Sequence, residues 1–307
     1  MRSKSGLVKS ANECIILGGG VKMIEKYEFD GKENGERLLI LAAVHGNETA
    51  GTNACNRIID EFKRGGLTLQ KGHLTIVPVC NPEAYRRDVR SIDENLNRVM
   101  MMHEHPQSYE QKLANEICPL IKNHRVVLDL HSTHCVGDVP FAFCDYPDEY
   151  NRKLIDALAV DFVLEGWPEI YGRQEAIQDF STEQCAHAYG NTATTLECGY
   201  HKDPAAIELA YQAIINTLAV FEMIDLPRPA SCPKKHIRMD SYVLKTREGR
   251  LCHSYKHLDP VCKGDKIAVY DDGEALYAPA DGFILLPNLQ APVNTEWYYL
   301  GTALSGV

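Results

Sequence analysis

The chain has 307 residues, of which 45% are hydrophobic and 24% charged, a balance typical of globular proteins with room for one large domain and a smaller one. Its formal net charge is −10 and its pI about 5.6, so neither nucleic acid nor an anionic membrane is expected as a partner, because their phosphates would repel such a surface. No apolar run approaches the roughly 18 residues that a membrane-spanning helix needs.

The cysteines and the N-terminus indicate the compartment. The 11 cysteines are odd in number and scattered, and no CxxC occurs. This pattern predicts reduced, mostly buried thiols in a cytoplasmic protein. The basic start, MRSKSGLVKS, is not followed by an apolar stretch of signal-peptide length.

Gly18–Gly20 follows a possible edge strand at 13–17 and does not match GxGxxG, so we predict a turn there and not a nucleotide site.

The clearest predicted strand is LLILAAV at 38–44, seven apolar residues that suggest burial on both faces. It ends at His45, Gly46, Asn47 and Glu48, and a helix is predicted directly after it at 49–63. In open α/β sheets, ligands bind at the carboxyl ends of strands. The turn after this strand is therefore the first candidate site.

Strands and helices alternate through the next 160 residues. Pro82 predicts the start of a loop, and residues 165–192 are polar and irregular. The alternation predicts an α/β fold with a mixed, mostly parallel sheet sandwiched by helices. The further strands are predicted at 73–79, 126–130, 141–144, 162–164 and 194–197, and the further helices at 109–122, 148–160 and 204–224.

The best domain boundary is LPRPASCPKK at 226–235, which has three prolines in ten residues. We predict a catalytic domain at 1–228 and a small C-terminal all-β domain at 232–307. The short strands of the second domain are predicted at 242–244, 266–270, 275–277, 283–286 and 297–300.

Polar groups suited to a metal follow three of the predicted strands. They are His45 with Glu48, His131, and Glu197. Each has an ordinary structural explanation when taken alone: a strand-end histidine is usually a hydrogen-bond partner, Glu48 suits a helix N-terminus, and Glu197 suits an exposed position. Together they suit one catalytic centre, and we interpret them as such.

The chemistry we expect is that of catalytic zinc, which takes three nitrogen and oxygen ligands and leaves a fourth position for water. His45, Glu48 and His131 are the expected ligands. Zinc lowers the pKa of its water to about 7, and a carboxylate that is not a ligand must then carry the proton, for which Glu197 is the candidate. Asp129 faces the same side as His131 and is a candidate to orient a ligand imidazole.

The order of motifs carries a family resemblance. VHGNETAG, NPEAYRRDVRSIDENLNR, LDLHSTH and TLECGY resemble, in this order, the succinylglutamate desuccinylase and aspartoacylase family of zinc carboxypeptidase-like hydrolases. The resemblance covers about residues 37–225. It implies one Zn²⁺ per chain on His45, Glu48 and His131, and a general base and acid at Glu197.

The same resemblance implies roles for the arginine-rich loop. Arg90 matches the arginine that polarises the scissile carbonyl, and Asn97 with Arg98 matches the pair that binds the carboxylate of the substrate. Where the family often has DLNR, this chain has Asn95 in place of the aspartate. The C-terminal part is similar to the β-barrel-like tail of many members, without a lysine placed for lipoyl attachment.

We therefore expect a zinc amidohydrolase that removes the acyl group from a small anionic N-acyl amino acid. The first alternative is a metallocarboxypeptidase that acts on a peptide or a peptidoglycan fragment, because it would use the same site. The second is a non-catalytic metal- or ligand-binding homologue. A serine hydrolase is disfavoured because no GxSxG elbow occurs. A homo-oligomer is left open by the sequence.

Overall fold

The structure of the protein is a computed structural model that describes residues 23–171 and 180–304. The expected edge strand at 13–17 and the glycine turn at 18–20 lie outside the described residues. None of the helices in the described part has the length and apolarity to cross a lipid bilayer.

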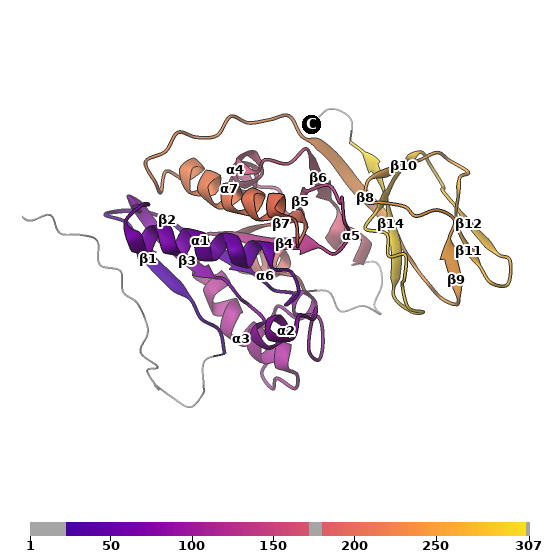
Figure 1. The fold of residues 1–307 in the computed structure, drawn as a ribbon, viewed down its shortest axis with the longest axis horizontal. Helices are drawn as coiled ribbons and strands as arrows, with labels where there is room; N and C mark the ends of the chain where they lie inside the picture. The colour runs from indigo at the N-terminus through magenta and orange to yellow at the C-terminus, as the bar shows by residue number, and fades with distance from the viewer. Residues whose placement is uncertain (1–22, 172–179, 305–307) are drawn as a thin grey trace, which may run out of the picture.

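An 11-stranded sheet runs through the molecule in the order β1-β3-β2-β4-β7-β5-β6-β8-β14-β13-β10 (Figure 1). The pairs β3–β2, β2–β4, β4–β7, β5–β6 and β6–β8 are parallel. The pairs β1–β3, β7–β5, β8–β14, β14–β13 and β13–β10 are antiparallel. The α/β fold with a mixed, largely parallel sheet is confirmed. The strands of this sheet are β1 (Tyr27–Asp30), β2 (Glu33–Ala42), β3 (Lys71–Val77), β4 (Val126–Thr133), β5 (Phe141–Phe143), β6 (Phe162–Glu165), β7 (Thr192–Tyr200), β8 (Lys235–Leu244), β10 (Asp259–Val261), β13 (Gly282–Leu285) and β14 (Glu296–Ala303).

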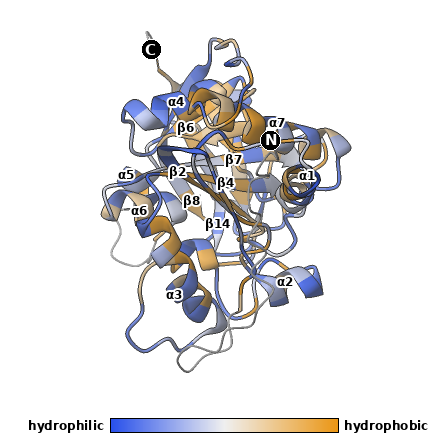
Figure 2. Cartoon of the chain, turned by 90° about the vertical axis from the view of Figure 1, so that its left-hand side faces the viewer, coloured by the Kyte–Doolittle hydropathy of each residue, from blue (hydrophilic) through white to orange (hydrophobic). Residues whose placement is uncertain are grey.

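Helices cover both faces of the parallel part of the sheet, and β2 shows why. Leu38 and Ile40 face one hydrophobic cluster with α1, α4 and α7, while Leu39 and Leu41 face a second cluster with α3 and α6. Figure 2 shows hydrophilic and hydrophobic residues side by side along α3, as a half-buried helix requires. The helices are α1 (Ala50–Arg64), α2 (Pro82–Arg87), α3 (Tyr109–Lys122), α4 (Glu149–Ala157), α5 (Trp167–Tyr171), α6 (Thr182–Ala188) and α7 (Pro204–Val220), with a 3₁₀ turn η1 (Leu96–Arg98).

Two segments expected to be irregular contain helices. Pro82 does not open a loop but begins α2, because proline suits the first helical position and the Asn81 side chain accepts a hydrogen bond from Ala84 N. Between 165 and 192 the structure forms α5 and α6, and Ser181 caps α6 by accepting from Gln184 N. These capping signals were present in the sequence, but the helices are too short to show a clear period.

The C-terminal part is antiparallel β structure, as expected, and it is joined to the rest through β8. This strand pairs in parallel with β6 and antiparallel with β14. A separate three-stranded sheet contains β9 (Gly249–Leu251), β11 (Lys266–Tyr270) and β12 (Ala275–Tyr277). Residues 227–234 form no helix or strand, and we keep the division at 228–232 as a proposal.

One buried histidine makes the stability of the fold depend on pH. The His124 Nδ1–H donates to Leu120 O at 2.6 Å, and Nε2 accepts from the Thr75 hydroxyl at 2.8 Å. The neutral ring is therefore fully bonded, and burial lowers the pKa of His124 to about 4. The unfolded chain takes up this proton near pH 6.5, so between about pH 6.5 and 4 the unfolded state binds more protons and stability falls with falling pH.

We predict that His124→Gln removes part of this pH dependence. The native histidine should contribute up to about 3 kcal/mol to the loss of stability between pH 7 and 4. The measurement is urea unfolding of the wild type and the variant at pH 7 and pH 4.5. Replacing the exposed His105 by glutamine is the control, and it should leave the difference in unfolding free energy between pH 7 and pH 4.5 as it is in the wild type. Equal pH dependence in the wild type and His124→Gln would contradict the prediction.

Candidate metal centre

The turn between β2 and α1 directs two polar side chains into one buried space. Ala43 has a positive φ of 47°, which turns the chain away from the strand direction. Gly46 lies against α2, where a Cβ would be 2.2 Å from the carbonyl carbon of Ala84, and its N–H donates to Arg90 O at 3.1 Å. With the turn held in this way, His45 and Glu48 are only 3% and 5% exposed.

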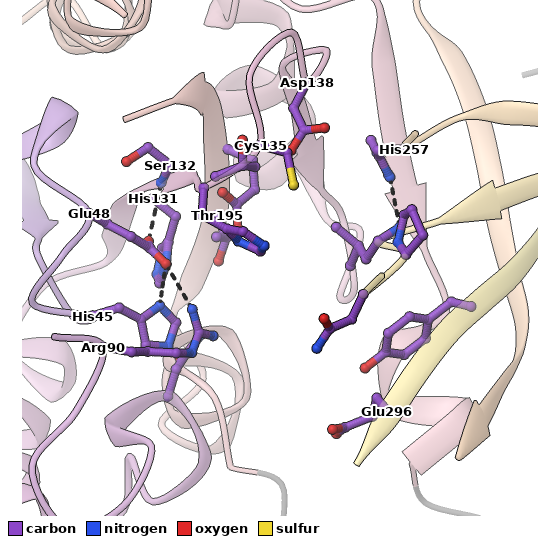
Figure 3. A pocket seen from close by; sticks show the side chains of 18 of the residues that line it. His45, Glu48, Arg90, His131, Ser132, Cys135, Asp138, Thr195, His257 and Glu296 are labelled. Carbon is purple, nitrogen blue, oxygen red and sulfur yellow. Dashed lines mark hydrogen bonds and ion pairs between the residues drawn. The ribbon is translucent and has the colours of Figure 1, made fainter. Parts of the chain in front are cut away.

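The neighbouring strand β4 delivers the third group. His131 follows the apolar part of β4, and its Nδ1 lies 2.9 Å from Glu48 Oε2, while His45 Nδ1 lies 2.8 Å from Glu48 Oε1. One donor atom from each of the three residues lies within 4.8 Å of the other two. Figure 3 shows the three side chains converging on one side of a pocket. Two nitrogens and one carboxylate oxygen at this spacing are a set that zinc binds.

The far nitrogens of both imidazoles are held by oxygen atoms. His45 Nε2 lies 2.9 Å from Asn95 Oδ1, and His131 Nε2 lies 3.0 Å from Asp129 Oδ2. These oxygens accept, so each Nε2 carries a proton, and each Nδ1 is the nitrogen left to bind a metal once it gives up any proton shared with Glu48. The contact of Asp129 was expected. That of Asn95 was not, and its only signal in the sequence was the departure from DLNR.

Mutual charge stabilises this cluster. Burial acts to raise the pKa of Glu48, but the adjacent His45 and His131 outweigh it and hold that pKa well below its usual range. Burial acts to lower the pKa of His131, yet the carboxylates of Asp129 and Glu48 keep it well above its usual value. Burial, together with Arg90, lowers the pKa of His45 to about 4. The proton on His131 therefore balances the charge of Glu48, and a metal cation can take the place of that proton.

Glu197 lies on β7 in register with His131 on β4. Burial raises the pKa of Glu197 to about 8, with a further contribution from the charge of Glu48. Its Oε2 atom is buried and has no hydrogen-bond partner among the described residues. A buried carboxyl group with one unoccupied oxygen is placed to exchange a proton with a bound molecule.

The loop after α2 contributes the basic side chains. Arg90 donates from a guanidinium nitrogen to Glu48 Oε1 at 3.0 Å, although its side chain is 52% exposed. Arg98 lies over the Trp167 ring at 5.0 Å and donates to Asn97 O at 3.0 Å. The Asn97 Oδ1 accepts from Thr182 N at 2.9 Å, which fixes the loop to α6.

One cavity of about 740 Å³ is lined by all the residues expected to bind the metal, carry the proton or bind the substrate, whereas Asp129 lies behind His131 and does not line it. The C-terminal segment also lines it, which the sequence did not predict. Most of those residues come from loops between short strands, which have no period of their own, whereas two of them lie in β14. They include Tyr255, Lys256, His257, Asn288, Glu296 and Tyr299, and α6 adds Glu183.

Comparison with known proteins identifies the family. The model of the succinylglutamate desuccinylase/aspartoacylase catalytic domain matches residues 34–203, more than half of the chain. The chain therefore belongs to the succinylglutamate desuccinylase/aspartoacylase family.

Individual relatives are more distant. A succinylglutamate desuccinylase from Vibrio cholerae is 26% identical over 209 residues, which are 66% of this chain and 60% of the relative. One from Pseudomonas fluorescens is 31% identical over 132 residues, 40% of this chain and 38% of the relative. The chain thus spans about 60% or less of the length of these relatives.

Solved structures share the fold over nearly the whole chain. A succinylglutamate desuccinylase from Vibrio parahaemolyticus has a TM-score of 0.73 at 18% identity, covering 91% of this chain and 86% of that one. A product-bound ectoine utilization protein from Ruegeria pomeroyi has a TM-score of 0.72 at 20% identity, covering 92% and 90%. At these identities the likeness shows a common fold.

The close packing of Gly46 gives a prediction about the site turn. Gly46→Ala places a methyl group against the backbone of α2, and we expect a loss of roughly 2 kcal/mol or more in the free energy of unfolding. Gly66→Ala is the control, because a Cβ there would meet its nearest atom at an ordinary 3.5 Å. Urea unfolding of both variants is the measurement. If the two variants lose the same stability, the packing described for the turn is wrong.

Proposed function

We propose that this chain is a zinc-dependent hydrolase that cleaves the amide bond of a small anionic N-acyl amino acid. The observation that supports it most is the set of three buried donor atoms within 4.8 Å of one another, in one cavity with the carboxyl group of Glu197. The names of the relatives, succinylglutamate desuccinylases, support the substrate class.

The donor set fits one zinc ion per chain. His45, Glu48 and His131 offer two imidazole nitrogens and a carboxylate oxygen, and Asn95 and Asp129 hold the rings in the tautomer that a metal needs. When bound, zinc supplies a Lewis acid and makes water acidic enough to ionise near pH 7. The remaining steps fall to side chains of the chain itself.

Glu197 is proposed to carry the proton. Its carboxylate would accept a proton from the attacking water and donate it to the nitrogen of the leaving amine. Burial favours the protonated form of Glu197, and a cation beside it favours the ionised form, so the two effects poise the group near neutral pH. A general base and acid is most effective when its pKa lies close to the working pH.

The basic loop is proposed to bind and polarise the substrate. The Arg90 guanidinium lies beside Glu48 and would donate to the amide oxygen as that oxygen gains negative charge. Asn97 and Arg98 would bind the carboxylate of the amino acid, a task suited to the planar fork of arginine. Trp167 packs against the Arg98 guanidinium and limits its freedom.

The two alternatives make different demands on the cavity. A metallocarboxypeptidase needs room for a peptide, whereas here residues such as Tyr255 and Asn288 of the C-terminal segment line the same cavity as the ligand set. This arrangement favours a small substrate. A non-catalytic binding protein has no need of a proton carrier, so the presence of Glu197 favours an enzyme.

We also propose a cytoplasmic location. The ten cysteines in the described part are all free, and Cys118 and Cys185 remain thiols although their sulfur atoms lie 3.6 Å apart. Unpaired thiols in this number suit a reducing compartment.

The test is hydrolysis by the zinc-loaded protein. We expect N-acetyl and N-succinyl amino acids to be cleaved in preference to dipeptides. Glu197→Gln should lower kcat by about 100-fold or more, because the proton carrier is lost, while the zinc content measured by mass spectrometry stays the same.

Each part of the proposal has its own contrary result. Faster cleavage of peptides would favour the carboxypeptidase. A Glu197→Gln variant that stays within a few-fold of the parent would remove Glu197 from the mechanism. A chain that holds one zinc ion and hydrolyses neither class would be the binding homologue.

A further inference from the structure

His257 lies in the loop between β9 and β10, is 5% exposed, and lines the cavity. In Figure 3 it lies on the side of the pocket opposite His45, Glu48 and His131. The Leu286 N–H donates to His257 Nδ1 at 3.0 Å. Because Nδ1 accepts this bond, the single proton of the neutral ring is on Nε2.

The Nε2–H group of His257 does not contribute a hydrogen bond to the described part of the fold. Nε2 is buried and has no hydrogen-bond partner among the described residues. A buried donor without a partner destabilises a protein by about 1–3 kcal/mol. The ring itself is held in place by packing against Phe141, with ring centroids 4.3 Å apart, and burial lowers its pKa to about 3, so it stays neutral. The result is a fixed, uncharged donor.

Strained backbone lies on both sides of this histidine. Leu258 directly after it has a φ of 71°, and Leu286, its backbone donor, has a φ of 45°. Left-handed backbone at leucine costs roughly 1–2 kcal/mol per residue. Such strain persists where the surroundings impose it, and it gathers at binding sites. Here it holds the imidazole in one orientation and one tautomer.

The charge of the cavity limits what the donor can bind. Among the described residues, the lining includes six Asp or Glu side chains and three Arg or Lys side chains. Burial raises the pKa of three of the six, Asp138, Glu183 and Glu197, to about 7 for Glu183 and about 8 for Glu197, so these three carry less charge near neutral pH. Like charges 4 Å apart repel by about 1 kcal/mol in water and by about 4 kcal/mol near a protein surface. A carboxylate placed against the uncharged His257 would lack the countercharge that a buried carboxylate needs, whereas a neutral oxygen needs only one hydrogen bond.

We propose that His257 determines specificity: its Nε2–H donates to an uncharged oxygen, an amide carbonyl or a hydroxyl, at the end of the substrate opposite the candidate metal centre. This inference rests on the proposed function. It narrows the substrate to an N-acyl amino acid that has one carboxylate and a neutral polar far end.

The experiment uses two pairs of probes that differ only in charge. N-acetylglutamine is compared with N-acetylglutamate, and N-succinamoylalanine with N-succinylalanine, because the far end can belong to either half of the substrate. Dissociation constants are measured by calorimetry on the zinc-loaded Glu197→Gln protein, so that turnover does not interfere. We expect the amide member of at least one pair to bind about tenfold more tightly than its acid.

Two substitutions separate the donor from the acceptor of the ring. His257→Asn keeps an oxygen near the position of Nδ1 for the Leu286 N–H and removes the Nε2 donor. It should weaken binding of the preferred amide about fivefold to tenfold and reduce the ratio within the pair. His257→Gln places an amide N–H₂ group near the position of Nε2 and should retain most of the preference. Zinc content and the unfolding midpoint are measured in parallel.

Several results would overturn the proposal. These are an acid bound as tightly as its amide in both pairs, an unchanged ratio in folded His257→Asn, or no binding of any probe. Equal binding of acid and amide, and the absence of any binding, are both measured without a substitution at position 257. Hydrolysis by the unsubstituted protein is read separately. Binding that depends on His257 without hydrolysis would refute only the proposed function, and hydrolysis with an unchanged ratio would refute only the role of His257.

Discussion

The carboxylate of Glu48 lies between two imidazole nitrogens, and the rest of the site depends on this one contact. A buried carboxylate is tolerated only where charges and hydrogen bonds compensate it. Here His45 and His131 each approach one of its oxygens, and the backbone N–H of Ser132 donates to Oε2 at 3.2 Å. The same arrangement leaves two nitrogens and an oxygen turned towards one point, as a metal requires.

The sheet provides this geometry because β2, β4 and β7 are parallel neighbours. Their carboxyl ends lie at one edge of the sheet. Each of the three strands is apolar along most of its length and presents a polar group at this edge. The strained Ala43 and the tightly packed Gly46 then turn the chain so that two groups of β2's turn point the same way. Stability in the strands is thus combined with strain in the turns at the site.

The sequence allowed the core strands and the grouping of His45, Glu48 and His131 to be predicted, since unbroken apolar runs ending in His45 and His131 are local signals. It did not reveal α2, because Pro82 suits both a loop and a helix start. Nor did it reveal His257, whose place in the cavity follows from the pairing of β8 with β6, and β8 begins more than a hundred residues after the end of β4. Long-range pairing and backbone strain leave no periodic pattern to read.

The most direct measurement of the central claim is X-ray absorption at the zinc edge of protein loaded with one equivalent of zinc. The account predicts tight binding of one zinc per chain, two imidazole nitrogens at about 2.0–2.1 Å, oxygen ligands at about 2.0–2.2 Å, and no sulfur. Because the chain has 11 cysteines, sulfur ligands are available to a misplaced zinc ion, and their absence from the spectrum would be informative. Failure to retain zinc, or a sulfur shell at about 2.3 Å, would contradict the site built on Glu48.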